Sequence, residues 1–252
     1  MIRGIYTSTS ALNAYELKQS VLANNLANID TPGFKKDVFS VKGAEDVALA
    51  RFTGNENPVF LGEMSSGVQP GTEAYTDFSQ GRIESTGNPF DLAIEGEGFF
   101  VVDMGGQEAY TRAGNFTLDG EGRLVTLSGY PVQGKNGEII IPGKGTVMVD
   151  EQGQIRVDGE VVDELRIVNF GEKSVLKKEG KNLFTLRDGE MQPEEAQGFR
   201  VRQGFLEKSN VDIVEAMVDM ISALREYEIS QKTIMSHDEA LSRATNEIAR
   251  LS

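Results

Sequence analysis

The last part of the chain decides the fold: residues 205–252 read FLEKSNVDIVEAMVDMISALREYEISQKTIMSHDEALSRATNEIARLS. This stretch contains no Gly and no Pro, although the whole chain holds 28 Gly and 7 Pro. Because Gly and Pro most often end regular structure, the stretch predicts one long helix, with Ser209 and Asn210 at its start. Its seam, at alternating spacings of three and four, consists of Ile213, Met217, Met220, Leu224, Tyr227, Gln231, Ile234, Asp238, Leu241, Thr245 and Ile248.

The beginning of the chain has the same character, because Gly4 is the one Gly or Pro in the first 31 residues. A helix is expected to end at residues 30–33, since the residue before Pro32 avoids the α region and Gly33 permits a turn. Its seam is Ile5, Ser8, Leu12, Tyr15, Gln19, Leu22, Leu26 and Ile29.

Between these helices the sequence predicts short strands joined by Gly turns. Asp158-Gly159 separates residues 154–157 from 160–162, which is a strong hairpin signal, and residues 119–122 separate two further apolar runs. The predicted class is therefore α+β: paired, coiled-coil-like terminal helices that flank a Gly-rich antiparallel β body. We expect residues 1–34 with 205–252 to form a discontinuous helical assembly domain, 35–68 an extended linker or loop, and 69–204 a β-rich domain.

Composition excludes several classes of function. The chain has 252 residues and a formal net charge of −14, and phosphate binding needs clustered Lys and Arg, so nucleic acid is not an expected partner. No apolar run approaches 18 residues, so no membrane span is expected. Without Cys there is no disulfide or thiolate chemistry.

Catalytic and cofactor motifs are missing as well. His237 is the one His, so no pair of His or Cys ligands can share a metal. Residues 96–101, GEGFFV, begin like a dinucleotide fingerprint but continue into an apolar strand. We expect no enzyme activity and no cofactor. Acidic pairs such as Glu194-Glu195 leave open a cell-wall carbohydrate-binding or hydrolysing module, which the lack of Trp disfavours, and a stand-alone coiled-coil adaptor is a second alternative.

Four segments in order resemble the flagellar basal-body rod family, which includes rod, hook and hook-associated axial proteins. They are residues 23–35 (ANNLANIDTPGFK), 87–101 (GNPFDLAIEGEGFFV), 110–116 (YTRAGNF) and 204–211 (GFLEKSNV). Residues 217–221 and 225–228 resemble the family's C-terminal helix. The signature positions are Asn24, Asn25, Leu26, Ala27, Asn28, Thr31, Pro32, Gly33 and Phe34.

The resemblance implies a structural subunit that polymerises into a hollow axial shaft, with the paired terminal helices inside and the β body outside. The expected assembly interface is Ile5, Leu12, Leu22, Leu26, Ile213, Met217, Met220, Leu224, Tyr227, Ile234, Leu241 and Ile248. Expected partners are other copies, other rod and hook axial proteins and the flagellar export apparatus.

The same resemblance implies a location in the flagellar basal body, in the periplasm or cell-wall zone, reached without a cleaved signal peptide. Residues 5–7 and 214–220 favour the proximal rod protein. Residues 67–72 and 78–81 equally resemble the distal one, which stays as the alternative.

Overall fold

The computed structural model describes residues 2–43, 46–51, 59–65, 68–70, 74–143, 145–187 and 192–251, and it divides into two compact units. The first unit contains residues 1–26, 37–75 and 213–252, and the second contains residues 27–36 and 76–212. Two helices and a largely antiparallel set of strands make the protein α+β, as the sequence predicts. Residues 27–36 and 205–212 belong to the compact unit of the β body, whereas the expected helical domain includes 27–34 and 205–212.

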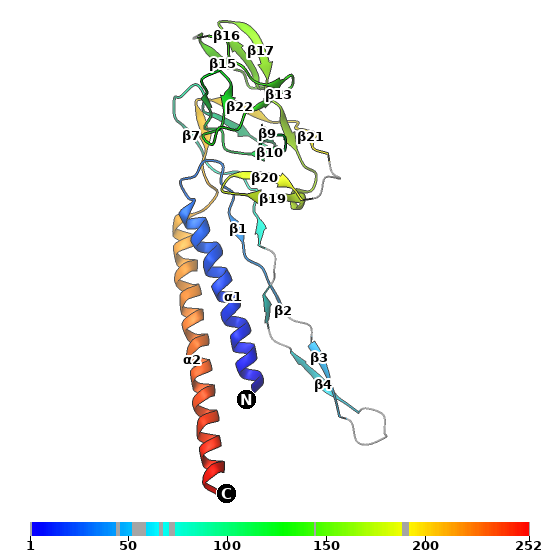
Figure 1. Cartoon of the computed structure of the whole chain (residues 1–252), viewed down its shortest axis with the longest axis vertical. Coiled ribbons are helices and arrows are strands. Elements are labelled where there is room, and N and C mark those ends of the chain that lie inside the picture. The colour runs from blue at the N-terminus through cyan, green and yellow to red at the C-terminus, as the bar shows by residue number, and fades with distance from the viewer. Residues whose placement is uncertain are drawn as a thin grey trace. The chain divides into compact units, whose positions relative to one another are not determined.

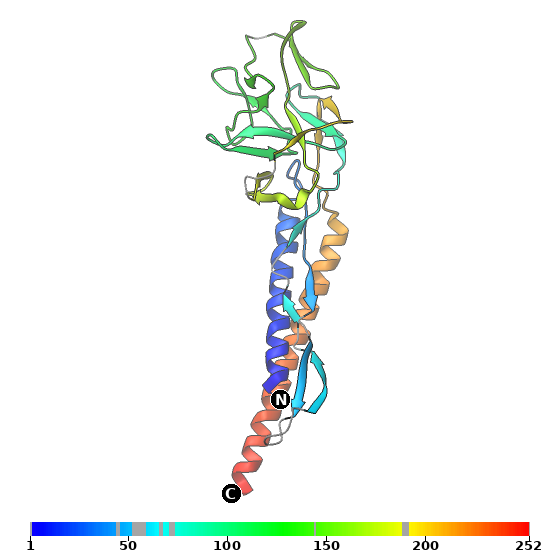
Figure 2. The same cartoon turned by 90° about the vertical axis from the view of Figure 1, so that its right-hand side faces the viewer.

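The first unit holds both helices. Helix α1 (Ile2–Ala27) and helix α2 (Ile213–Leu251) lie side by side and antiparallel (Figures 1 and 2). Lys18 Nζ lies 3.0 Å from Glu226 Oε2 and joins them. Helix α2 begins at Ile213 rather than at the expected Ser209-Asn210, because the Asn210 side chain binds backbone groups of the β body instead of capping the helix.

The first unit also holds a ribbon of short antiparallel strands (Figure 1). Strand β2 pairs with β5 and β3 pairs with β4, and β1 pairs with β6 where the chain passes to the second unit. The expectation of a linker or loop over residues 35–68 missed these strands. Their bounds are β1 Asp37–Val38, β2 Val41–Gly43, β3 Asp46–Arg51, β4 Val59–Ser65, β5 Val68–Pro70 and β6 Tyr75–Thr76.

The second unit is built on a six-stranded sheet of order β19-β20-β10-β9-β18-β21, in which every neighbouring pair is antiparallel. Its strands are β9 Phe99–Asp103, β10 Glu108–Thr111, β18 Ile167–Asn169, β19 Leu176–Glu179, β20 Leu183–Leu186 and β21 Glu194–Glu195. A short 3-10 helix, Lys173–Val175, leads into β19.

Smaller antiparallel pairs complete this unit: β7 with β23, β8 with β22, β11 with β12, β13 with β14, and the three-stranded β15-β16-β17. Asp158 (φ +50°) and Gly159 (φ +91°) form the turn between β16 and β17, which confirms the predicted hairpin. The bounds are β7 Ile83–Ser85, β8 Leu92–Glu95, β11 Thr117–Leu118, β12 Leu124–Val125, β13 Gln133–Gly134, β14 Gly137–Glu138, β15 Val147–Val149, β16 Gln154–Val157, β17 Glu160–Glu164, β22 Arg200–Gln203 and β23 Phe205–Glu207.

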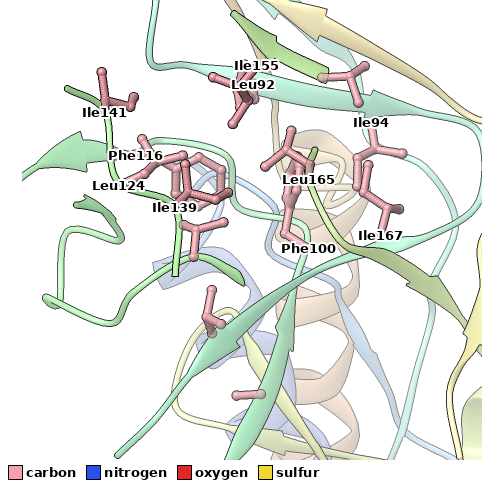
Figure 3. Packing of buried hydrophobic residues seen from close by; sticks show 14 of the residues in the cluster. Leu92, Ile94, Phe100, Phe116, Leu124, Ile139, Ile141, Ile155, Leu165 and Ile167 are labelled. Atoms are coloured by element: carbon pink, nitrogen blue, oxygen red, sulfur yellow. The ribbon is translucent and has the colours of Figure 1, made fainter. Parts of the chain in front are cut away.

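The central strand β9 explains how the core of this unit is divided. Phe100 and Val102 belong to one buried cluster, and Phe99 and Val101 belong to another. Successive side chains of a strand point to opposite faces, so β9 is buried on both. The larger cluster, shown in Figure 3, gathers side chains from seven of the body strands and the loops beside them. The apolar run FFVV is therefore the signature of a central strand covered on both sides.

Candidate assembly site

The signature loop, residues 27–36, follows α1 and folds as a compact turn. Thr31 N donates to Asn28 O at 3.1 Å, and Phe34 N donates to Thr31 O at 3.3 Å. Just before the loop, the Asn25 amide exchanges two hydrogen bonds with the Asp37 backbone, at 2.8 and 2.9 Å. Asn25 and Asn28 are both buried. Two asparagines of the family signature therefore form hydrogen bonds that hold the loop: Asn25 bonds the backbone at its far end, and Asn28 accepts from the Thr31 hydroxyl at its start.

Gly33 brings the signature loop against the β body. Its φ of +66° lies in the region that favours glycine, and a Cβ added there would lie 2.2 Å from Ala113 N. Gly33 N donates to Glu207 O at 2.8 Å. Any side chain at this position would therefore force the loop away from the body.

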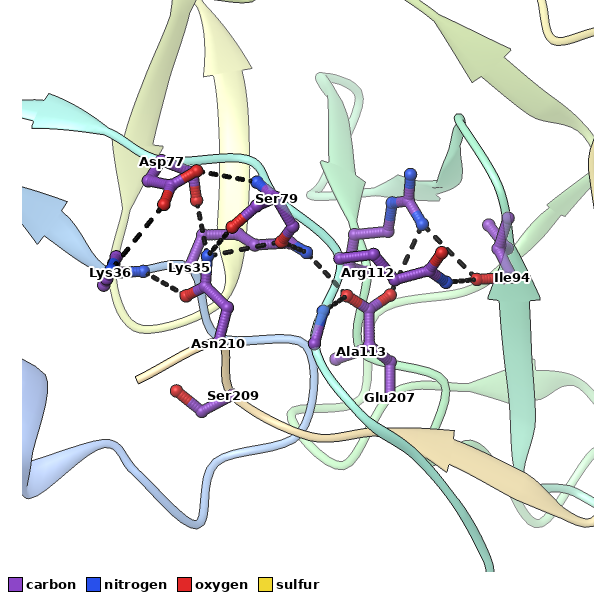
Figure 4. A network of polar contacts seen from close by, with 12 residues as sticks. Lys35, Lys36, Asp77, Ser79, Ile94, Arg112, Ala113, Glu207, Ser209 and Asn210 are labelled. Atoms are coloured by element: carbon purple, nitrogen blue, oxygen red, sulfur yellow. Dashed lines mark hydrogen bonds and ion pairs between the residues drawn. The ribbon is translucent and has the colours of Figure 1, made fainter. Parts of the chain in front are cut away.

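The centre of the contact is a buried carboxylate between two cations, shown in Figure 4. Glu207 and Lys35 side chains are 0% exposed, with Lys35 Nζ 2.5 Å from Glu207 Oε1. Arg112 Nη1 lies 3.3 Å from Glu207 Oε2. We call Lys35, Glu207 and Arg112 the buried triad.

Further hydrogen bonds complete the triad. Lys35 Nζ donates to Ser79 O at 2.7 Å, Gly81 N donates to Glu207 Oε1 at 2.9 Å, and Arg112 Nη2 donates to Gly96 O at 2.8 Å. Burial lowers the pKa of Lys35, although the Glu207 carboxylate opposes this shift. Burial likewise lowers the pKa of Arg112, again against the attraction of Glu207. With both carboxylate oxygens engaged, the arrangement holds segments together rather than presenting a free base.

Asn210 fastens the segment that leads out of the body towards α2. Its Oδ1 accepts from Lys36 N at 2.7 Å, and its Nδ2 donates to Asp77 O at 2.9 Å (Figure 4). The same part of the body thus holds two segments of the chain: residues 34–36, which follow α1, and residues 207–210, which precede α2. Neighbouring Phe34 is buried, and Lys178 Nζ lies 4.1 Å from its ring centroid.

The outer side of the signature loop is open. Asp30, Thr31 and Pro32 line a pocket of about 380 Å³ together with residues of the β body. The signature therefore has two sides: Asn28, Gly33 and Phe34 pack inwards, and Thr31 and Pro32 face the pocket. Of the remaining signature positions, Asn24 and Ala27 are exposed and Leu26 is half-buried.

The structure splits the expected assembly residues into two groups. Half-buried side chains are Leu12, Leu22, Leu26, Met220, Tyr227, Ile234 and Leu241. Exposed side chains are Ile213, Met217 and Leu224. The side chains of Ile5 and Ile248 lie outside the described residues.

The more buried side of α2 shares every second position with the expected seam, and each position between them is shifted by one residue towards the N-terminus. It carries Ala216, Met220, Ala223, Tyr227, Ser230, Ile234, His237 and Leu241. Small alanines there, Ala223 being 0% exposed, permit close packing.

Sequence reasoning missed the buried triad and Asn210 as functional positions. All four residues lie within the segments that resemble the rod family. A charged or amide residue inside an otherwise apolar or Gly-rich motif could have pointed to them. Within the described ranges, no group of three His, Cys, Asp or Glu side chains could hold a metal. Neither helix, over its described residues, is long and apolar enough to cross a membrane.

Comparison with known proteins matches the parts of this arrangement to one family. Residues 5–35 match the family described as flagella basal body rod protein. Residues 93–157 match the flagellar hook protein FlgE/F/G D1 domain, and residues 202–247 match the flagellar basal body rod FlgEFG protein C-terminal. The matches cover most of both helices and, in the β body, residues 93–157 and the strand that leads to α2.

Whole-chain relatives agree. The flagellar basal-body rod protein FlgG of Bacillus subtilis is 34% identical over 98% of this chain and 99% of its own length. FlgF of Caulobacter vibrioides is 34% identical over 98% of both chains, and FlgF of Salmonella typhimurium is 31% identical over 100% of both. The chain belongs to the flagellar basal-body rod protein family. It is a structural subunit of the bacterial flagellar basal body and not an enzyme, and rod proteins of this kind assemble with other flagellar axial proteins.

Proposed function

We propose that this rod subunit polymerises through its two terminal helices, which form a coiled-coil-like wall around the axis of a hollow shaft. The observation that carries the proposal is a stripe of apolar side chains on α2 that are exposed in the part of the chain that the structure describes. The exposed stripe consists of Ile213, Val214, Met217, Val218, Ile221 and Leu224, each between 46% and 67% exposed.

The exposed stripe is a second apolar surface of the same helix. At about 100° per residue, it lies beside the more buried side that carries Met220 and Ala223. Apolar residues therefore cover far more of the helix than one partner helix can bury. A contiguous exposed apolar patch marks a surface for protein association, because burying a Leu or Ile side chain stabilises an interface by roughly 1.5–3 kcal/mol.

Polar positions in the seam support a role in assembly. Gln19 and Gln231 occupy expected seam positions, and the Gln19 Nε2 atom is buried without a hydrogen-bond partner in the described part of the chain. Polar groups in a helical seam lower the stability of a pair while selecting its register. We propose that the Gly-rich β body packs outside the helices, and that contacts which do not close into a ring extend the shaft.

We further propose that the subunit leaves the cell through the flagellar type III export apparatus without a cleaved signal peptide, and that it acts in the periplasm or cell-wall zone. A position in the proximal rod is favoured by residues 5–7 and 214–220. The distal rod is the alternative, supported by residues 67–72 and 78–81.

Leu224→Asp tests the mechanism. It places a carboxylate in the exposed stripe, where burial of an unpaired charge costs at least several kcal/mol at every added subunit. Because Leu224 is exposed in the single chain, the monomer is expected to fold with an unchanged circular dichroism spectrum while cells lack rods and do not swim.

Thr233→Asp is the matched control. Thr233 is exposed and lies nine residues beyond Leu224, on the opposite side of α2, so the same new charge stays in solvent. We expect normal rods from this variant. If Leu224→Asp also assembles normally, the exposed stripe is not an assembly surface.

A further inference from the structure

The two edges of the six-stranded sheet carry opposite charges. Strand β19 forms one edge and is followed by Lys181 in the turn to β20; its own Lys177 is exposed. Strand β21 forms the other edge and consists of Glu194 and Glu195, both exposed (Figure 1). An edge strand presents unpaired backbone groups and charged side chains to whatever lies beside it.

The basic edge is unusual for this chain. Residues 172–187 contain five Lys or Arg and two Glu, a net charge of +3 (5 − 2), whereas the whole chain has 25 basic and 39 acidic residues. Lys173 and Lys178 are engaged within the body, by Glu97 and by the Phe34 ring. Lys177 and Lys181 make no ion pair in the part of the chain that the structure describes.

The acidic edge likewise makes no ion pair, although Glu195 adds to the raised pKa of Lys135, which the Glu164 carboxylate mainly causes. Glu194 and Glu195 form no ion pair among the described residues, although the neighbouring surface of the body is rich in such pairs, for example Lys135 with Glu164 at 2.8 Å. Lys177 and Lys181 at one edge, which outnumber the exposed Glu179 between them, and Glu194 and Glu195 at the other edge are therefore left without an ion pair on opposite sides of one sheet.

We infer that the basic edge at Lys177 and Lys181 docks against the acidic edge at Glu194 and Glu195 of a second copy of this chain. Two basic edges repel one another, and so do two acidic edges. Charge therefore favours a contact between the basic edge of one copy and the acidic edge of the next. Such a contact is head-to-tail: each copy offers one basic and one acidic edge, and the series stays open.

Strand direction is compatible with this contact. Five successive antiparallel steps separate β19 from β21, so the two edge strands run in opposite directions. A basic edge placed beside the acidic edge of the next copy would again be antiparallel, as are all the pairs within the sheet. The inference rests on the proposed function only in that copies of the chain are neighbours in the rod.

Cross-linking in purified basal bodies tests the contact, and the introduced thiols are the only ones in this chain because its sequence has no Cys. The variant Lys177→Cys/Glu194→Cys is assembled and oxidised with copper phenanthroline. Five inter-strand spacings put the two positions about 24 Å apart within one chain, too far for an internal disulfide. We expect a ladder of covalent dimers and larger multimers. The variant Lys177→Cys/Glu160→Cys, with the second thiol on exposed β17, should give none.

Charge exchange supplies an independent test. Lys177→Glu/Lys181→Glu and Glu194→Lys/Glu195→Lys should each lower the yield of rods several-fold, and the four changes together should restore most of it. Glu160→Lys is the single-charge control and should leave the yield unchanged. Missing multimers, cross-links only to other axial proteins, or no recovery in the fourfold variant would each overturn the inference.

The outcomes separate this inference from the proposed function. If Leu224→Asp blocks assembly while no Lys177–Glu194 ladder forms, the helices assemble the rod and the sheet edges do not meet. If the ladder forms while Leu224→Asp assembles normally, the edge contact stands and the helical mechanism fails.

Discussion

Glu207→Gln is the sharpest perturbation of the buried triad. The amide is nearly the same size as the carboxylate, so packing is retained while the negative charge between Lys35 and Arg112 is removed. One amide oxygen can still accept from Lys35 Nζ or Gly81 N, but the amide NH₂ then faces Arg112 Nη1, which is itself a donor. The two cations remain buried with only neutral carbonyl acceptors.

The expected loss is large. Removing one partner of a buried ion pair costs about 3–5 kcal/mol, because the remaining charge stays uncompensated in a low-dielectric site. Domains are typically stable by only 5–15 kcal/mol, so much of the β body's stability is lost. The measurement is urea unfolding of the purified chain, followed by circular dichroism, with the midpoint and slope compared to wild type.

Two controls sharpen this result. Glu164→Gln removes a carboxylate from an exposed pair with Lys135, where about 1 kcal/mol or less is expected. Lys35→Met should destabilise the Glu207→Gln variant less than it destabilises the wild type, because in the variant it removes a buried ammonium that has no carboxylate partner. The reasoning is refuted if Glu207→Gln destabilises the chain no more than Glu164→Gln does.

Three further predictions concern the signature loop, the Tyr110 phenol and the N-terminus. Gly33→Ala should destabilise the signature loop, since the added Cβ meets Ala113 N at 2.2 Å and φ is +66°. The control is Gly87→Ala, where no atom lies within 4 Å of the added Cβ. We expect protease to cleave within residues 27–36 faster in Gly33→Ala than in the control, and equal rates would contradict this. Burial and the nearby Glu108 carboxylate raise the pKa of Tyr110 to about 12, so the stability it contributes is complete below pH 10 and is lost as pH rises through 12. The free energy of unfolding should fall by up to about 3 kcal/mol over this pH range. Tyr110→Phe should remove that fall, and an unchanged dependence of stability on pH would argue against the role of Tyr110. Mass spectrometry of the subunit from basal bodies should find an uncleaved N-terminus or loss of Met1 alone, and a chain shortened by about 20 residues would rule out export without cleavage.

The sequence was sufficient for the regular parts of the fold. Long segments with no Pro and at most one Gly predicted both helices, because these are the two least favourable residues in a helix interior. Asp158-Gly159 predicted the β16–β17 hairpin, since its turn needs positive φ at both residues. These are local properties of the chain, so they can be read from local sequence.

Non-local properties could not be read in the same way. The side of α2 that is more buried includes Ala223 rather than Leu224, because a small residue lets a neighbouring helix approach, and a seam defined by large apolar residues overlooks this. The partners Lys35 and Glu207 lie 172 residues apart, so no local pattern joins them. The strands between residues 37 and 76 also escaped prediction, since four of the six are only two or three residues long.

A cryo-EM map of basal bodies that contain this subunit would show directly which surfaces build the rod. We expect α1 and α2 to line the channel, with Met217 and Leu224 of one copy packed against a terminal helix of the next copy and the β body on the outside. A map in which the exposed stripe of α2 faces solvent, or in which the β body lines the channel, would contradict the proposed mechanism of assembly.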